Sequence, residues 1–416
     1  GHFDSSDERL NWLHNAATWS FRGNACDVPT DCPTRERSGW SGDWQIFSAT
    51  AAYLFDTSEF NRKFLADARL GQFDNGVITN IIPVELASIS EGFMRDNNGS
   101  SGWGDVIVES PLAQYRATGD LSFLKDNFES MTKWVDFAIE RASTRRHPAR
   151  MDRAAEPHER YLWDDGFHWG EWLEPSSDLS DFGAFLQADK SSVATAYLYR
   201  SSRDLAEIAR ILGEPESVVD YYLDVARNVK TAWQKTFLAP DGSVNPPTQA
   251  TYVRALHFGL LPEALEGAAA AKLAALIRDN GTRLDTGFLS TVYLLPTLAD
   301  FGYSDLAFEL LYQNKRPSWM YMRERGATTV WESWNGIDED GVPHESLNHY
   351  SKGAVVDFLH QYVAGLKIIE PGYRRFAVKP HPAPGLEWAS TSHHAPAGLI
   401  EVEWRQSGGV FTLEVL

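Results

Sequence analysis

Apolar residues recur at i, i+3, i+4 and i+7 along most of this 416-residue chain. That spacing puts them on one face of an α-helix, so it indicates amphipathic helices packed on their apolar sides. Capping residues such as Ser58 and Asp120 stand at expected helix starts, and Gly119, Gly213 and Gly302 stand at expected ends. We therefore predict a mainly α fold of about a dozen helices, over residues 7–20, 43–56, 58–72, 83–95, 105–118, 121–142, 190–212, 216–237, 249–258, 262–279, 286–301, 303–314 and 346–365.

The last forty residues have a different pattern. Apolar and polar residues alternate over 399–404 and 410–416, and the two stretches are separated by "RQSGG", which predicts a β-hairpin. A few strands do not form a stable sheet alone. They either pack on the helical body or form part of a β-domain.

Charge and composition exclude several partners. The net charge of −19 and the pI near 5.0 argue against nucleic acid and anionic membranes, which bind clustered Lys and Arg. No run of 18 apolar residues and no signal peptide is visible, so cytoplasmic and secreted locations both stay open. Cys26 and Cys32 could form a disulfide, although free thiols are the commoner state, and two cysteines are too few for a zinc site. We expect no metal and no cofactor.

Three sets of loops combine acids with tryptophan and glycine. They are "DCPTRERSGWSGD" at 31–43, "GWGD" at 102–105 together with "HWGEWLEP" at 168–175, and "GATTVWESWNG" at 326–336. A glycosidase needs one protonated carboxyl, one ionised carboxylate and aromatic walls that desolvate the sugar. Any single acid here could instead cap a helix or pair with an arginine. Three such loops in one chain favour a carbohydrate site.

Two neighbouring features allow two interpretations each. Arg35 and Arg37 flank Glu36, and they could be ion-pair partners or could bind hydroxyl groups; an adjacent guanidinium lowers a carboxyl pKa, so burial must offset it if Glu36 donates a proton. His349 in "ESLNHYSKG" could be a core residue or part of a site. Signatures of serine hydrolases, dinucleotide binding, P-loops and zinc proteases are absent from the sequence.

These motifs together resemble the catalytic domain of glycoside hydrolase family 78, the α-L-rhamnosidases. The resemblance rests on "RGNACDVPTDCPTRERSGWSGDWQIFSATAAYLF", "SSGWGDVIVESPLAQYRATGD", "LDTGFLSTVYLLPTLADFG", "GATTVWESWNG" and "ESLNHYSKGAVVDFLHQYVAGL", in the family's order. It implies an (α/α)6 barrel, which agrees with the predicted helices. We accordingly predict a barrel over 1–370 and a short C-terminal β segment, a partial β-sandwich, over 371–416. Members also usually carry β-sandwich domains before the barrel and a complete one after it, which this sequence does not contain.

The resemblance also implies roles for individual residues. Glu36 would be the general acid and Glu332 the general base in an inverting hydrolysis of terminal α-L-rhamnosides. Many members have one more acid in the first loop, written DCPQRDER, and many read GDW where this chain has "GEW" with Glu171. The candidate substrate-binding residues are Asp31, Arg35, Trp40, Asp43, Trp103, Asp105, Glu171, Trp172, Trp331 and His349.

We therefore predict an α-L-rhamnosidase that acts on a rhamnose-containing glycoside or oligosaccharide. Two alternatives stay open. One is another (α/α)6 carbohydrate-active enzyme, either a different glycosidase or a polysaccharide lyase that uses a Tyr or His base. The other is a non-catalytic sugar-binding protein that retains the pocket.

Overall fold

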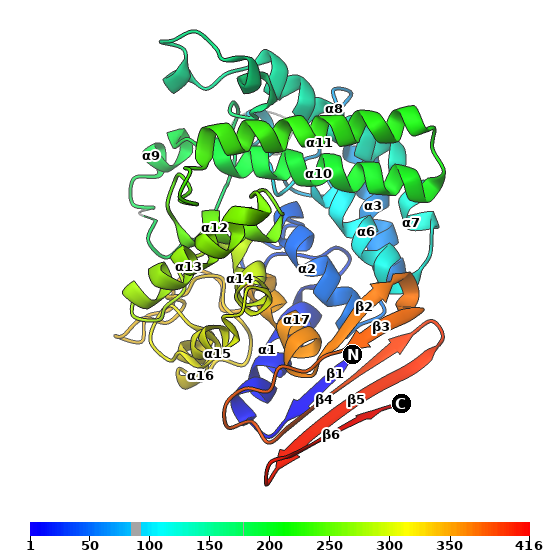
Figure 1. The fold of residues 1–416 in the computed structure, drawn as a ribbon, viewed down its shortest axis with the longest axis vertical. Coiled ribbons are helices and arrows are strands. Elements are labelled where there is room, and N and C mark those ends of the chain that lie inside the picture. Colours follow the sequence, from blue (N-terminus) through cyan, green and yellow to red (C-terminus); the bar gives the residue numbers. More distant parts are fainter. Residues whose placement is uncertain (85–92, 178) are drawn as a thin grey trace.

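The computed structural model describes residues 1–84, 93–177 and 179–416. Most of these residues belong to helices that surround a common axis, with a β-sheet along one side (Figure 1). The α-helices are α1 (Glu8–Asn24), α2 (Ser41–Leu54), α3 (Ser58–Gly71), α5 (Phe93–Asp96), α6 (Val106–Thr118), α7 (Ser122–Lys125), α8 (Phe128–Thr144), α9 (Phe182–Gln187), α10 (Ser191–Leu212), α11 (Glu216–Phe237), α12 (Gln249–His257), α13 (Glu263–Asp279), α14 (Phe288–Asp300), α15 (Ser304–Tyr312), α16 (Trp319–Glu324) and α17 (Val356–Phe358). Short 3-10 or π turns are η1 (Pro148–Arg150), η2 (Pro157–Tyr161), η3 (Ser351–Val355), η4 (Leu359–Val363) and η5 (Pro371–Tyr373).

Among the described residues, six helical segments form a closed inner ring. Each contacts the next in the order α2, α6, α10, α12, α14 and η3, and η3 returns to α2. Outer helices cover them: α1 packs on η3, α3 on α6, α8 and α11 on α10, α13 on α12, and α15 on α14. The predicted (α/α)6 barrel is confirmed. Ten of the fifteen tryptophans are buried in the main core, so core packing accounts for about two thirds of them.

Most predicted helices agree with the structure within a few residues, two do not, and one is largely untested. The prediction over 121–142 was wrong as one helix, because Asn127 separates α7 from α8 and its side chain donates to Phe123 O. The prediction over 346–365 was wrong at its start, because residues 346–350 pair with the loop at 329–332 instead of forming helical hydrogen bonds. The prediction over 83–95 falls largely on 85–92, outside the described residues.

The C-terminal strands pack on the helical body. Strands β4 (Trp388–Ala395), β5 (Gly398–Ser407) and β6 (Val410–Val415) form an antiparallel sheet that includes the predicted hairpin. Its fourth member is β1 (His2–Ser5), which pairs with β4 so that His2 faces Ser392. Trp404 joins the main core and donates from Nε1 to Val363 O at 2.8 Å.

A second, two-stranded sheet connects the barrel to these strands. It consists of β2 (Leu366–Glu370) and β3 (Arg375–Val378). The division at residue 370, between these two strands, stays a prediction. No helix among the described residues is long and apolar enough to cross a bilayer.

Candidate active site

The loop between α1 and α2 folds tightly and so gathers its acids. Ser38 N–H donates to the Asp31 carboxylate, and Asp31 N–H donates to Ser38 O, both at 2.9 Å. Glu36 N–H donates to the sulfur of Cys32 at 3.1 Å. Asp43 follows in the first turn of α2, where it is buried. Asp31, Glu36 and Asp43 consequently line one pocket.

A second loop, between α16 and η3, supplies the opposing carboxylate. Glu332 N–H donates to Ser346 O at 2.9 Å, and Ser346 N–H donates to Glu332 Oε2 at 3.1 Å. His349 N–H donates to Val330 O at 2.8 Å. Lys352 Nζ contacts the carbonyl of Glu332. These hydrogen bonds hold the segments at 330–332 and 346–349 together, so the Glu332 carboxylate and the His349 ring lie at the same pocket.

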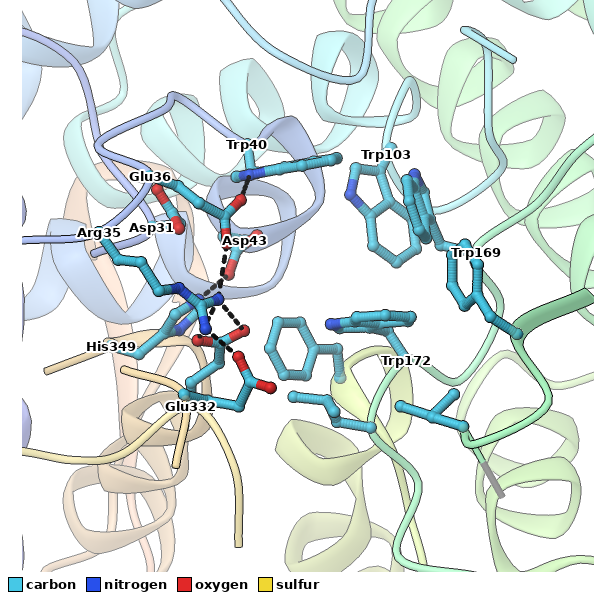
Figure 2. A pocket seen from close by; sticks show the side chains of 15 residues that line it. Asp31, Arg35, Glu36, Trp40, Asp43, Trp103, Trp169, Trp172, Glu332 and His349 are labelled. Atoms are coloured by element: carbon cyan, nitrogen blue, oxygen red, sulfur yellow. Dashed lines mark hydrogen bonds and ion pairs between the residues drawn. The ribbon is translucent and has the colours of Figure 1, made fainter. Parts of the chain in front are cut away.

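The pocket has a volume of about 390 Å³ and lies at one end of the barrel (Figure 2). Asp43 and Phe288 sit at the N-terminal ends of α2 and α14, and Trp103 and His349 just precede α6 and η3. The lining residues are Asp31, Arg35, Glu36, Trp40, Asp43, Trp103, Trp169, Trp172, Leu173, Leu179, Phe182, Phe288, Glu332, Glu345 and His349.

Arg35 joins the two principal carboxylates. Its Nη2 lies 2.7 Å from Glu36 Oε1 and 3.0 Å from Glu332 Oε2, and its Nη1 contacts Glu345 (Figure 2). Trp40 Nε1 donates to the other oxygen of Glu36 at 2.9 Å. Two carboxylates from segments almost 300 residues apart therefore share one guanidinium.

Burial keeps protons in this pocket. Burial raises the pKa of Glu332, while the charge of Arg35 opposes the rise. Burial also raises the pKa of Asp31 to about 6 and that of Asp43 well above its usual range, and neighbouring carboxylates add to both increases. Near neutral pH the group of acids is therefore partly protonated, as a site that both donates and accepts protons requires.

His349 stands against Asp43 as a neutral ring. Its Nε2 lies 3.3 Å from Asp43 Oδ1, and burial lowers its pKa well below the usual value. Nδ1 lies 2.9 Å from the Ser351 hydroxyl, which can donate to it. With that tautomer, the Nε2 hydrogen faces Asp43.

The opposite side of the pocket is aromatic. Trp169 packs edge-on against Trp40 and Trp172, with ring centroids 5.4 and 5.3 Å apart, and lies 6.2 Å from Trp103. Gly42 allows this arrangement, because a Cβ there would come within 2.5 Å of the Trp103 ring. The side chains form a continuous wall facing the acids (Figure 2).

Of the residues predicted from the sequence, nine line the pocket, and Asp105, Glu171 and Trp331 do not. Asp105 accepts from Gly102 N–H, Trp134 Nε1 and Ser201 Oγ inside the fold. Glu171 accepts from Gly287 N–H and Ser290 and pairs with Arg254. These carboxylates satisfy backbone and side-chain donors behind the pocket.

Trp331 precedes Glu332 in the sequence but does not line the pocket. It is 1 % exposed, and its ring packs directly against Gly336, where a Cβ atom would come within 2.7 Å of the indole. The sequence analysis missed six lining residues. Four of them stand inside quoted motifs: Trp169 and Leu173 in "HWGEWLEP", Phe288 in "LDTGFLSTVYLLPTLADFG" and Glu345 in "ESLNHYSKG". Leu179 and Phe182 lie outside the quoted motifs.

Both cysteines are free, with Cys26 exposed and Cys32 buried. No cluster of three or more His, Cys, Asp or Glu side chains suited to a metal ion occurs within 1–84, 93–177 and 179–416.

A six-fold helical ring with a carboxylate pocket at one end defines the class of (α/α)6-barrel glycosidase domains. Within that class, residues 1–363 match the bacterial alpha-L-rhamnosidase 6 hairpin glycosidase domain, and residues 365–416 match the bacterial alpha-L-rhamnosidase C-terminal domain. The chain belongs to the bacterial α-L-rhamnosidase family, and the predicted family membership is confirmed.

Relatives match over the whole of this chain. An alpha-L-rhamnosidase of Streptomyces avermitilis is 35 % identical over 99 % of this chain and 37 % of its own length. One from Formosa agariphila is 32 % identical over 100 % of this chain and 42 % of its own length. This chain thus spans about two fifths of these relatives.

Solved structures agree with this family. The Streptomyces avermitilis alpha-L-rhamnosidase complexed with L-rhamnose superposes with a TM-score of 0.88 at 34 % identity, covering 100 % of this chain and 37 % of that one. The native Aspergillus terreus rhamnosidase has a TM-score of 0.88 at 32 % identity, covering 100 % and 46 %.

Proposed function

We propose that this chain is the catalytic part of an α-L-rhamnosidase that removes terminal α-L-rhamnose from a glycoside with inversion. Residues 1–370 would form the catalytic barrel and 371–416 an accessory β segment. The observation that carries the proposal is the pair Glu36 and Glu332, brought to one guanidinium in a pocket of about 390 Å³. The names of the relatives, and the L-rhamnose in one solved structure, support the choice of sugar.

In the proposed reaction, Glu36 is the acid and Glu332 the base. Glu36 gives its proton to the glycosidic oxygen as the bond from that oxygen to the anomeric carbon breaks. Glu332 takes a proton from a water whose oxygen bonds to the anomeric carbon from the opposite face. After the reaction Glu332 carries a proton and Glu36 is ionised. Proton exchange with solvent then restores the protonated Glu36 and the ionised Glu332. The net change is addition of one water.

Other lining residues would bind the sugar. Asp31, Asp43 and His349 offer acceptors and a donor for hydroxyl groups, and Arg35 can turn its donors from the carboxylates to the sugar. Rhamnose carries a methyl group where most hexoses carry a hydroxymethyl group. The wall of Trp103, Trp169 and Trp172 provides an apolar surface suited to that methyl.

The test is hydrolysis of 4-nitrophenyl α-L-rhamnoside, with the anomer of the released sugar followed by NMR. We expect activity in the wild type, inverted rhamnose as the first product, and a loss of about 10²–10⁴-fold in Glu332→Gln. Glu36→Gln should lose only roughly tenfold on this substrate, because nitrophenolate leaves without much help from an acid. Glu339→Gln is the matched control, because Glu339 is exposed in the same loop as Glu332 and away from the pocket.

A folded wild type that binds rhamnose but leaves every rhamnoside intact would favour a sugar-binding protein. Retained configuration in the product would contradict the assigned roles of the two acids.

A further inference from the structure

A second cavity, of about 450 Å³, adjoins the proposed rhamnose pocket. Leu173 and Leu179 line both cavities. The second cavity is also lined by Ser333, Trp334 and Asn335, which directly follow Glu332 in the sequence. If the first pocket holds the terminal sugar, as proposed above, this adjoining groove receives what is attached to that sugar.

Two arginines line the groove without an acidic partner. Arg283 Nε donates to the carbonyl of Asn280 at 2.9 Å, and Arg316 contacts the side-chain oxygen of Asn335. No carboxylate of the described residues forms an ion pair with either guanidinium. By contrast, Arg35 in the neighbouring pocket is fully engaged by carboxylates. Two uncompensated cations therefore line one groove of a chain whose net charge is −19.

Among the described residues that line the groove, one is an acid, Glu174, and its carboxyl group does not cancel the charge of the arginines. Burial, with the nearby charges of Glu171 and Asp285, raises the pKa of Glu174 to about 8. At neutral pH its carboxyl group is therefore largely uncharged. An anion entering the groove meets the two guanidinium groups and no compensating carboxylate among the described lining residues.

The segments that carry the arginines are held together. Gln313 Nε2 donates to Thr282 O at 2.7 Å, and Gln249 Nε2 donates to Arg283 O at 3.1 Å. On the opposite wall, Ser176 N–H donates to the Asp285 carboxylate at 2.9 Å. These hydrogen bonds hold the loop at 281–285 against the neighbouring segments, so the groove is formed before any ligand binds.

We propose that this groove is an aglycone subsite for an acidic sugar, so that the preferred substrate carries a uronate next to the terminal rhamnose. The fork of a guanidinium matches a carboxylate in two parallel hydrogen bonds, and two such forks in one groove select an anion over a neutral sugar. This inference rests on the proposed function, because that function fixes which cavity holds rhamnose.

Binding is measured by calorimetry on Glu332→Gln, which removes turnover. The probes are rhamnosyl-glucuronate disaccharides linked through each of the three ring hydroxyls, and the methyl ester of each, which has the same shape without the charge. We expect at least one acid to bind about tenfold or more tightly than its ester at low ionic strength. The preference should shrink with added salt.

The variants Arg283→Gln and Arg316→Gln, placed together in the same background, should abolish the preference, so that each acid binds no more tightly than its ester. Arg227→Gln is the control, since Arg227 is 75 % exposed on α11 and away from the groove. Equal binding of acid and ester in every linkage overturns the subsite, as does a preference that survives the double variant.

Hydrolysis of the aryl rhamnoside separates the two proposals. If the enzyme cleaves it while acids and esters bind equally, only the acidic subsite fails. If it does not cleave it and the acid preference is present, only the proposed activity fails.

Discussion

The two sides of the pocket are built on different physical principles. The acid side holds each group by directed contacts, such as the 2.7 and 3.0 Å bonds from Arg35 to Glu36 and Glu332. The aromatic side holds its rings by packing, with centroids 5–6 Å apart and little hydrogen bonding (Figure 2). In the reaction proposed above, the acid side determines where protons go, whereas the aromatic side excludes water and orients the sugar. Variants on the two sides should therefore differ in kind as well as in size.

The largest effect should come from the two acids, and it should depend on the leaving group. Nitrophenolate leaves without much help, so Glu36→Gln should lose roughly tenfold on the nitrophenyl rhamnoside and about 10³-fold on an alkyl rhamnoside. Glu332→Gln should lose about 10³-fold on both. The measurement is kcat/KM on the two substrates, and parallel losses in the two variants would remove the distinction between acid and base.

A second prediction concerns stability on the acid side. The pKa of Asp31 is near 6 in the folded chain and about 3.8 when unfolded, so the folded state binds more protons between these values. Stability therefore falls as pH rises from about 4 to about 6. Two pKa units correspond to about 3 kcal/mol.

Asp31→Asn keeps an acceptor for Ser38 N–H without the charge. It should be more stable than the wild type at pH 7, by up to about 3 kcal/mol, and equal to it near pH 4. Thermal melts at both pH values check this. A lower melting temperature for the variant at pH 7 would show that the buried charge is stabilised by contacts stronger than those described.

On the aromatic side, Trp172→Ala should lower kcat/KM by about tenfold, mostly through KM, because it removes a packing surface and no proton donor. Trp172→Phe should recover most of the loss. Trp19→Ala is a suitable control, since Trp19 is 52 % exposed on α1 outside the pocket. A loss confined to kcat, with KM unchanged, would assign this wall a role in the chemical step.

The smallest effect should come from Glu345, which contacts Arg35 at the rim where both side chains are 40–47 % exposed. Exposed ion pairs contribute about 0–1 kcal/mol, so Glu345→Gln should change kcat/KM by less than about fivefold. The difference should disappear in high salt. A loss as large as that of Glu332→Gln would mean that the rim carboxylate takes part in the reaction.

Local signals made much of the fold predictable. Helices α10 and α11 begin and end within one residue of the prediction, because their apolar periodicity is strong and Gly213 marks the end of α10. The C-terminal hairpin was equally clear. Strand β1 was not predictable, since four residues become a strand only by pairing with β4, almost 390 positions away. Residues 346–350 likewise take their shape from the loop beside them.

The candidate site shows the same limit at the level of side chains. Motifs located the loops that bear Glu36, Glu332 and Asp43, because acids beside Trp and Gly are unusual. The motifs did not show which way each side chain points. Asp105 and Glu171 stand beside Trp and Gly as the pocket acids do, but their carboxylates turn away from the pocket and contact buried donors. Phe288 stands in the quoted motif "LDTGFLSTVYLLPTLADFG", but its apolar neighbours look the same in the sequence, so the motif does not show which of them faces the pocket.

The pairing of β1 with β4 also makes this part of the sheet depend on synthesis of all the residues between the two strands. Phe3 pairs with Thr391, so β1 leaves the ribosome long before its partner does. At about 5–20 residues per second, the interval between the two strands is roughly 20–80 s. During that interval the backbone groups that β1 offers to β4 have no partner in that strand. A nascent chain that stalls before residue 388 cannot form this ladder, so pairing of β1 indicates that synthesis has passed β4.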